Sequence, residues 1–324
     1  MSTVHTPVLL KEVIEYLNPQ PGQNFIDCTF GGGGHSLEIL KRIGHNGKLL
    51  AIDADKETRN QKSEIRKSKN FLFINDNFKN LKKIVEENFK YPVHGILLDL
   101  GLSSDQLEKS GRGFSFQKNE PLDMRFDTSQ DLTAAHIINS YSLEDLYDIF
   151  KNYGDYPHAR RLSKIIFRIR KVKKFKTTKD LVDAVLEACC PGPRYLKLGF
   201  RQKDKWHRSK FALGARGGMS GIKKRIHPAT QVFQALRIAV NNELENLKQV
   251  LPQAVDILAK GGRLVVISFH ALEDKIVKVY FRELSRAENP KIKLLTKKPI
   301  SPSSEEVKSN PRSRSAKMRA VQKL

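Results

Sequence analysis

The chain has 324 residues, which suffice for one large α/β domain with an insertion or for two domains. Its 58 Lys and Arg residues against 35 Asp and Glu residues give a net charge of +23, which favours a polyanionic partner. A membrane-surface protein would show a basic amphipathic helix with exposed Trp, Phe or Leu, but the single Trp, Trp206, lies in a polar run, so RNA or DNA is favoured. The sequence lacks an apolar run of 18 residues, a secretion-signal pattern and enough cysteines for a disulfide framework or a metal cage, so we expect a cytoplasmic protein with reduced thiols, no membrane segment and no metal.

Strand-like and helical segments alternate over the first hundred residues. The periodicity predicts a helix over 8–17, ended by Asn18-Pro19. Strands are predicted over 24–30, 48–53, 71–76 and 94–101, with helical segments between them. The apolar run Ile96-Leu97-Leu98 is typical of a strand buried on both faces. This alternation predicts an α/β fold with a parallel, doubly wound, Rossmann-like sheet.

The alternation stops after Gly101, and a basic, helical section follows. Helical patterns are predicted over 129–150, 157–170 and 177–190. Ten Lys or Arg residues and no acid lie between 160 and 179, and eleven basic residues face one acid between 191 and 225. Such an excess suits contacts with phosphates, and a solubilising role stays the alternative for the second stretch. We interpret the section as a helical insertion with a basic loop.

The α/β pattern resumes at His227-Pro228, where Pro occupies the first position of a long helix. Gly261-Gly262 is expected to end the helical region before a strand over 263–269 and a helix over 271–284. Edge strands are expected over 291–296 and 317–321. The predicted domain organisation is therefore one α/β domain built from 1–108 and 228–324, interrupted by a helical domain over 109–227.

Four glycines, Gly31 to Gly34, lie between the first strand and the next helix. Asp53 ends the second strand, nineteen residues after Gly34. This spacing is typical of a βαβ nucleotide-binding unit with an acid for ribose hydroxyls. A dinucleotide motif would need Gly where Ser36 stands, so S-adenosylmethionine fits better than NAD. A purely structural turn stays an alternative.

Three further residues are placed at the same sheet edge by the strand pattern. His35 follows the glycines and could contact the amino-acid end of a cofactor, although a helix cap explains it equally well. Phe78 follows the third strand, where it either stacks on adenine or joins the core. Asp99 ends the fourth strand, where it is either a functional carboxylate at the sheet edge or a turn residue. The segment 111–126 mixes Arg and Phe, which suits stacking on an unpaired base.

Several blocks in order carry a resemblance to one family. The chain resembles the small-subunit ribosomal RNA N4-cytidine methyltransferases of the RsmH (formerly MraW) type, from end to end. The matching blocks are His5–Leu10, Asp27–His35, Asp99–Ser104, Arg112–Phe116, Pro121–Arg125, His227–Thr230, Phe233–Ile238, Val240–Leu244, Gly261–Arg263, Ile267–His270, Leu272–Asp274 and Asn310–Ala316.

The resemblance implies a class I S-adenosylmethionine methyltransferase with an inserted helical domain. Its implied substrate is the N4 amine of a decoding-centre cytidine in 16S rRNA of the small ribosomal subunit. The implied cofactor contacts are Gly33, Gly34, His35, Asp53, Phe78, Asp99 and Gln106. The oligomeric state stays open, with a homodimer among the options.

A cytosine N4 amine is a weak nucleophile, because its lone pair is delocalised into the ring. The protein must position it in line with the methyl group and offer a hydrogen-bond acceptor for its proton. The candidates are Asp99, the Leu100 carbonyl and Ser103, and we expect Asp99 and Ser103 to be catalytic. The alternatives are a DNA amino-methyltransferase, which typically carries Pro-Pro and an aromatic residue after the fourth strand, and a non-enzymatic RNA-binding protein on the same scaffold.

Overall fold

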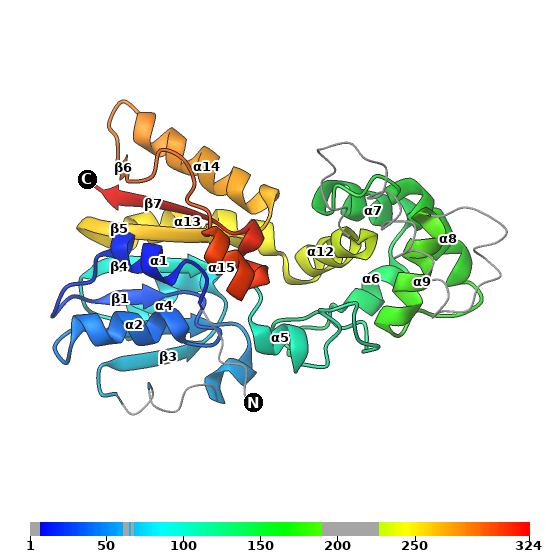
Figure 1. The fold of residues 1–324 in the computed structure, drawn as a ribbon, viewed down its shortest axis with the longest axis horizontal. Helices are drawn as coiled ribbons and strands as arrows, with labels where there is room; N and C mark the ends of the chain where they lie inside the picture. The colour runs from blue at the N-terminus through cyan, green and yellow to red at the C-terminus, as the bar shows by residue number, and fades with distance from the viewer. Residues whose placement is uncertain (1–6, 61–64, 66–67, 190–226) are drawn as a thin grey trace. The chain divides into compact units, whose positions relative to one another are not determined.

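The computed structural model describes residues 7–60, 65, 68–189 and 227–324, which form two compact units (Figure 1). Unit 1 contains the chain up to Asp105 and from Leu244 onward, and unit 2 spans Gln106–Glu243. The basic segment 191–225 lies outside the described residues. No helix in the described part of the chain is both long and apolar enough to cross a bilayer.

Unit 1 is built on a seven-stranded sheet of order β3-β2-β1-β4-β5-β7-β6. The first five strands pair in parallel, as predicted, whereas β7 is antiparallel to both β5 and β6, so the sheet is mixed. The strands are β1 (Phe25–Asp27), β2 (Leu49–Asp53), β3 (Phe71–Asn75), β4 (Val93–Asp99), β5 (Leu258–Ser268), β6 (Ile292–Leu294) and β7 (Lys317–Lys323).

The prediction of an edge strand over 317–321 was wrong, because β7 lies between β5 and β6. Its Lys and Arg residues would be easiest to accommodate at a solvent-exposed edge. Arg319 is nevertheless 8% exposed, and its guanidinium donates to both carboxylate oxygens of Asp274 at 2.7 and 3.2 Å. A paired guanidinium can be buried where a lone one cannot, so this pair permits an interior strand with a charge on it.

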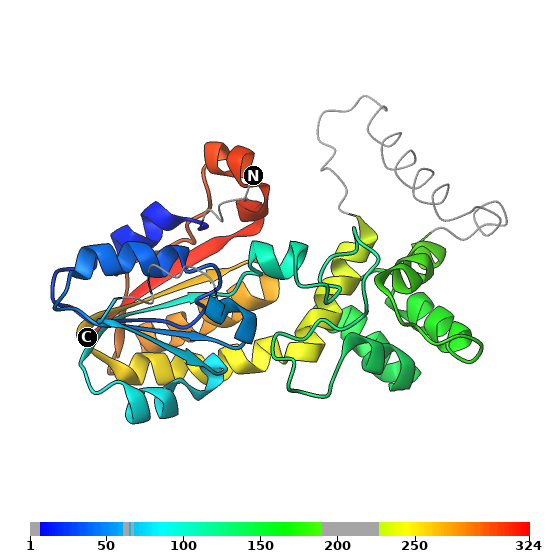
Figure 2. The same ribbon diagram turned by 90° about the horizontal axis from the view of Figure 1, so that it is seen from below.

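Helices cover both faces of the sheet (Figure 2). Side chains of successive strand residues point to opposite faces, so Ile96 and Leu98 pack with one helix layer and Leu97 with the other. One layer contains α1 (Leu10–Leu17) and α2 (Gly34–Ile43), and the other contains α4 (Leu81–Asn88), α13 (Glu243–Ile257) and α14 (Ala271–Arg286). Short helices complete unit 1: η1 (Lys56–Asn60), η2 (Phe78–Asn80), α15 (Ser304–Ser309) and η4 (Pro311–Ser315).

Unit 2 is helical, as expected for the insertion. The helices predicted over 157–170 and 177–190 are present as α8 and α9. The helix predicted over 129–150 is instead broken after Ser140, because Ser142 and Asp145 form a capping box that begins a new helix. The helices are α5 (Ser104–Glu108), α6 (Ala134–Ser140), α7 (Leu143–Asp148), the π-helical turn η3 (Ile149–Tyr153), α8 (Ala159–Ile169), α9 (Thr178–Cys189) and α12 (Pro228–Asn241).

The division between the units differs from the expected domain boundaries. The sequence predicts an insertion over 109–227, whereas the compact unit spans Gln106–Glu243. The reason is α12, which packs against η3 and α9. A Cβ at Gly154 would lie 2.7 Å from the Gln231 carbonyl oxygen, so the helix approaches the backbone of η3 closely.

The transition from α13 to β5 also occurs earlier than the glycines suggested. The helix ends at Ile257, and Gly261-Gly262 lie inside β5, where Gly261 has a φ of 79°. The pairing of β4 with β5 shifts in register between Val93 and Gly95, opposite this part of the strand. The two glycines therefore belong to a strand irregularity and do not end a helix.

Candidate active site

The carboxyl ends of β1, β2 and β4 bring the predicted site residues of unit 1 together. Because β1 lies between β2 and β4, Asp53 and Asp99 flank the glycine loop Gly31–Gly34. The Asp53 carboxylate accepts hydrogen bonds from the Gly31 N–H at 2.7 Å and from the Asp55 N–H at 2.8 Å. It therefore ties the loop to β2.

The glycines of the loop are required by its own geometry. Gly31 and Gly33 have φ angles of 48° and 67°, which residues with a Cβ atom rarely adopt. A Cβ at Gly33 would lie 2.8 Å from the Phe30 ring, and one at Gly34 would lie 2.2 Å from Cγ of Pro7. The turn and its packing thus account for three of the four glycines, and contact of Gly33 and Gly34 with a cofactor stays a prediction.

Asp27 fixes both ends of the loop, a role that the sequence analysis missed. Its carboxylate accepts from the Ser36 hydroxyl at 2.6 Å and from the Thr29 N–H at 3.1 Å, and Asp27 is 1% exposed. Burial raises the pKa of Asp27. The signal was available, because Asp27 and Ser36 bracket the glycines, but both residue types also occur in ordinary turns.

His35 lies between a carbonyl and a carboxylate. Its Nε2 is 3.0 Å from the Val8 carbonyl oxygen and its Nδ1 is 3.6 Å from Oδ2 of Asp99. A carbonyl oxygen only accepts, so Nε2 carries a hydrogen. Nδ1 therefore faces the Asp99 carboxylate, and a proton between the two groups would stabilise the contact.

Both strand-end carboxyls can change protonation near neutral pH. Desolvation by burial raises the pKa of Asp53 to about 7 and that of Asp99 to about 7. For Asp99, the charge of Glu273 raises the pKa further, while a hydrogen bond from the Gly101 N–H opposes the shift. A carboxyl with a pKa near the working pH can take up a proton during a reaction.

The other predicted site residues have different surroundings. Ser103 is 7% exposed, and its Cβ lies 3.8 Å from the position that a Cβ at Gly31 would occupy, so it adjoins the loop. Phe78 is half-buried and packs partly against the core, which leaves both of its interpretations open. Gln106 lies on α5 in unit 2. The structure therefore brings seven of the eight predicted residues to the carboxyl edge of the sheet in unit 1: Gly33, Gly34, His35, Asp53, Phe78, Asp99 and Ser103.

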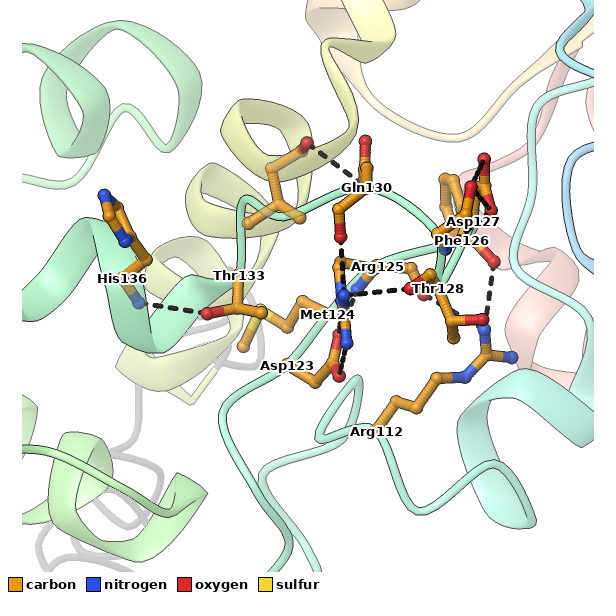
Figure 3. A network of polar contacts seen from close by, with 12 residues as sticks. Arg112, Asp123, Met124, Arg125, Phe126, Asp127, Thr128, Gln130, Thr133 and His136 are labelled. Atoms are coloured by element: carbon orange, nitrogen blue, oxygen red, sulfur yellow. Dashed lines mark hydrogen bonds and ion pairs between the residues drawn. The ribbon is translucent and has the colours of Figure 1, made fainter.

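The Arg- and Phe-rich segment of unit 2 is held by its own side chains (Figure 3). Nη1 of Arg112 donates to the carbonyls of Arg125 and Phe126 at 3.0 Å each, and Arg125 forms two 2.8 Å hydrogen bonds with Asp123. The Asn241 amide accepts from the Phe126 N–H at 2.7 Å and donates to the Met124 carbonyl at 2.8 Å. Met124 has a φ of 63°, a strained value that this network maintains.

Aromatic rings in this segment stack on one another. Phe114 and Phe126 lie with centroids 5.5 Å apart and an interplanar angle of 19°, and Phe116 stacks on His227 at 4.8 Å. Phe114 is buried, whereas Phe116 and Phe126 are half-buried. The mixture of Arg and Phe thus has an internal explanation, and stacking on an RNA base stays a prediction for the two half-buried rings.

The site fits S-adenosylmethionine. Each Asp53 oxygen accepts one backbone N–H and retains acceptor capacity for a ribose hydroxyl. The sheet order with an antiparallel β7, the glycine loop after β1 and the acid after β2 define a class I S-adenosylmethionine-dependent methyltransferase.

The sequence comparisons agree with this class. The chain belongs to the MraW methylase family, whose model matches residues 2–324. It is 44% identical over 335 residues to the ribosomal RNA small subunit methyltransferase H of Dehalococcoides mccartyi, covering 99% of this chain and 86% of the relative. It is 39% identical over 338 residues to the protein of the same name from Clostridium botulinum, covering both chains fully. The predicted resemblance is therefore confirmed.

Solved structures are more distant. A SAM-dependent O-methyltransferase from Thermotoga maritima matches with a TM-score of 0.40 and 10% identity, covering 100% of this chain and 68% of the other. At this TM-score the likeness is too weak to add to the family assignment.

Proposed function

We propose that this protein transfers the methyl group of S-adenosylmethionine to the N4 amine of a decoding-centre cytidine in 16S rRNA. The match of residues 2–324 to the family, with relatives named as small-subunit rRNA methyltransferases, is the observation that carries the proposal. The intact strand-end acids Asp53 and Asp99 support it.

S-adenosylmethionine supplies an electrophilic methyl group on a sulfonium. In the proposed mechanism, Asp53 holds the ribose hydroxyls while Asp99 accepts a hydrogen bond from the cytidine amine. That hydrogen bond localises the nitrogen lone pair for attack. The Asp99 carboxylate then takes up the proton that the nitrogen releases after methylation. A carboxyl with its pKa at about 7 suits both parts of this role. Ser103 adjoins the same loop and is the second candidate for orienting the amine.

A basic surface on unit 2 suits RNA phosphates. The exposed face of α8 carries Arg160, Arg161, Lys164 and Arg168, and the turn after it carries Lys171, Lys173, Lys174 and Lys176. Acids on α9 pair with two of them, since Arg168 contacts Glu187 at 2.5 Å and Lys173 contacts Asp180 at 2.8 Å. Repulsion along this surface is therefore partly relieved by acids that lie outside the run of ten basic residues. Phosphates would relieve the rest.

The two alternative functions receive less support. A DNA amino-methyltransferase is disfavoured by the family match and by the Leu100-Gly101-Leu102-Ser103 sequence after β4. A non-enzymatic RNA-binding protein would not need an acid at the end of both β2 and β4. The proposal places the protein in the cytoplasm, where small subunits assemble, and it does not require a homodimer.

The direct test supplies the protein and labelled S-adenosylmethionine to small-subunit rRNA from a strain that lacks the enzyme. We expect one labelled cytidine, identified by mass spectrometry as N4-methylated. Asp99→Asn serves as the control, with greatly reduced labelling. Label on another base, or on DNA in preference to rRNA, contradicts the proposal.

A further inference from the structure

The residues Pro7–Leu9, here called the strap, lie against the glycine loop. The Pro7 ring packs so closely on Gly34 that a Cβ there would come within 2.2 Å of Cγ of the proline. The Val8 carbonyl accepts from Nε2 of His35 at 3.0 Å. Val8 and Leu9 are 8% and 0% exposed. The strap therefore contacts two residues of the proposed cofactor site, and two of its three residues are buried.

The other end of the strap is held by a residue from the far end of the sequence. Leu9 precedes α1 with φ 54° and ψ 34°, a left-handed conformation that is unfavourable for leucine. Its N–H donates to Oε1 of Glu306 at 2.8 Å. Glu306 lies on α15, 297 residues away in sequence, where Ser303 caps the helix.

The link from α15 to the strap is polar. Within α15, no residue is fully buried, so replacing Glu306 opens no cavity in the core. What the replacement removes is the acceptor for a buried N–H on a strained residue. Leu9 would then relax toward an ordinary backbone conformation, and the Val8 carbonyl would move relative to His35.

We propose that Glu306 is a positioning residue for the cofactor site, acting through the strap on Gly34 and His35. By holding Leu9, it keeps Pro7 on the glycine loop and keeps the Val8 carbonyl as the acceptor that fixes Nε2 of His35 in its protonated form. The Nδ1 of the same ring then faces Asp99. The inference rests on the proposed cofactor site.

The test compares three variants of the full chain by calorimetric titration with S-adenosylmethionine. Glu306→Ala removes the acceptor, Glu306→Gln retains it, and Glu305→Ala changes the exposed neighbour on the same helix. We expect roughly tenfold weaker binding for Glu306→Ala, substantial recovery for Glu306→Gln and wild-type affinity for Glu305→Ala. Amide hydrogen exchange of Leu9 and Gly31–Gly34 in the cofactor-free protein should accelerate in Glu306→Ala alone.

A double-mutant cycle with His35→Asn separates positioning from general stability. If Glu306 acts through the strap, its removal should weaken binding much less when His35 is already replaced. Equal effects in both backgrounds, or wild-type affinity of Glu306→Ala, overturn the proposal. Should Glu306→Ala fail to fold, Glu306→Asp, which is one methylene too short, gives the same comparison. A wild-type protein that does not bind S-adenosylmethionine contradicts the cofactor site itself, which is a distinct outcome.

Discussion

Asp53 and Asp99 end strands on either side of β1, yet they contact different groups. Asp53 accepts two backbone N–H groups and thereby fixes the start of the glycine loop. Asp99 faces the ring of His35 and is 17% exposed at its side chain. The Asp53 carboxylate thus holds the loop and is proposed to hold the ribose, while Asp99 has a neighbour that can share a proton.

Replacing Asp53 should mainly affect cofactor binding. Asp53→Ala removes charge-assisted hydrogen bonds to the ribose, of roughly 1.5–3 kcal/mol, so affinity for S-adenosylmethionine should fall by about tenfold to a hundredfold. Calorimetric titration measures this, with a thermal melt to show that the variant is folded. An unchanged dissociation constant would remove the ribose role of Asp53.

Replacing the proposed proton acceptors should mainly affect the chemical step. Asp99→Asn and Ser103→Ala should slow single-turnover methylation more than they weaken cofactor binding, and loss of a positioned acceptor typically costs about 10²–10⁴-fold in rate. Rapid-quench kinetics at saturating cofactor isolate the step. If weaker cofactor binding accounts for the whole loss, Asp99 is a binding residue and not a catalytic one.

The raised pKa of Asp99 predicts a pH dependence of stability. Between its ordinary value of 3.8 and about 7, the folded protein binds a proton at Asp99 that the unfolded chain does not. The contribution of Asp99 to stability is therefore fully present below about pH 4 and is lost as the pH rises through about 7. Asp99→Asn should gain stability relative to the wild type across this interval, as urea unfolding at several pH values would show. Ser103→Ala changes no titrating group, so its free energy of unfolding should vary with pH in parallel with that of the wild type. A parallel curve for Asp99→Asn would contradict the prediction.

At the scale of elements, the strands β1, β2 and β4 were predictable because buried parallel strands are continuously apolar, and the edge strand β3 is apolar enough to be recognised beside them. The helix break at Ser142 was missed, since a capping box looks like ordinary polar residues in a helical pattern. The interior position of β7 was also missed, because the partner of Arg319, Asp274, lies 45 residues away. The local sequence pattern identifies a helix or strand. The position of that element in the sheet depends on contacts with residues that are distant in the sequence.

The same limit applies to the site. Asp53 and Asp99 were found because each ends a strand, and strand ends meet at one edge. The strap was not found, because the Leu9–Glu306 hydrogen bond joins opposite ends of the chain. Nor could the sequence show that Gly34 is needed for the approach of Pro7.

The basic surface of α8 and the following turn predicts salt-dependent RNA binding. Changing Arg161, Lys164, Lys174 and Lys176 together to Gln should weaken binding and flatten its dependence on salt, by roughly 0.7–0.9 in slope for each phosphate that is no longer neutralised. The matched control changes four exposed lysines of unit 1, Lys275, Lys278, Lys297 and Lys298, to give the same reduction in charge. Filter binding across a salt series distinguishes the two. Equal slopes for both variants would indicate a charge effect without specific phosphate binding.

At the scale of the whole molecule, unit 2 is inserted in the crossover from β4 to β5. The two strands are parallel neighbours, and the insertion leaves the sheet shortly after Asp99, the last residue of β4. A connection at the carboxyl edge of a parallel sheet begins where ligands bind in such folds. The chain thus adds its helical unit directly after a candidate catalytic residue.

Each unit has its own buried core, so we expect two unfolding transitions. S-adenosylmethionine at a hundred times its dissociation constant should stabilise the transition of unit 1 by about 2.7 kcal/mol. The transition of unit 2, which contains only Gln106 of the predicted cofactor contacts, should move much less. Differential scanning calorimetry with and without the cofactor measures both. A single transition that shifts as a whole would show that the units unfold together.

The interior position of β7 has a consequence for synthesis of the chain. β5 is complete at Ser268, but its second neighbour begins only at Lys317, and β6 pairs with β7 alone among the described strands. At ~5–20 residues per second, the intervening segment takes roughly 2–10 s to translate. During that time the nascent sheet has an unpaired edge at β5, which invites association with other chains. The inserted unit, whose residues all precede β5, can fold on the ribosome while the sheet that surrounds it in sequence is still waiting for its last interior strand.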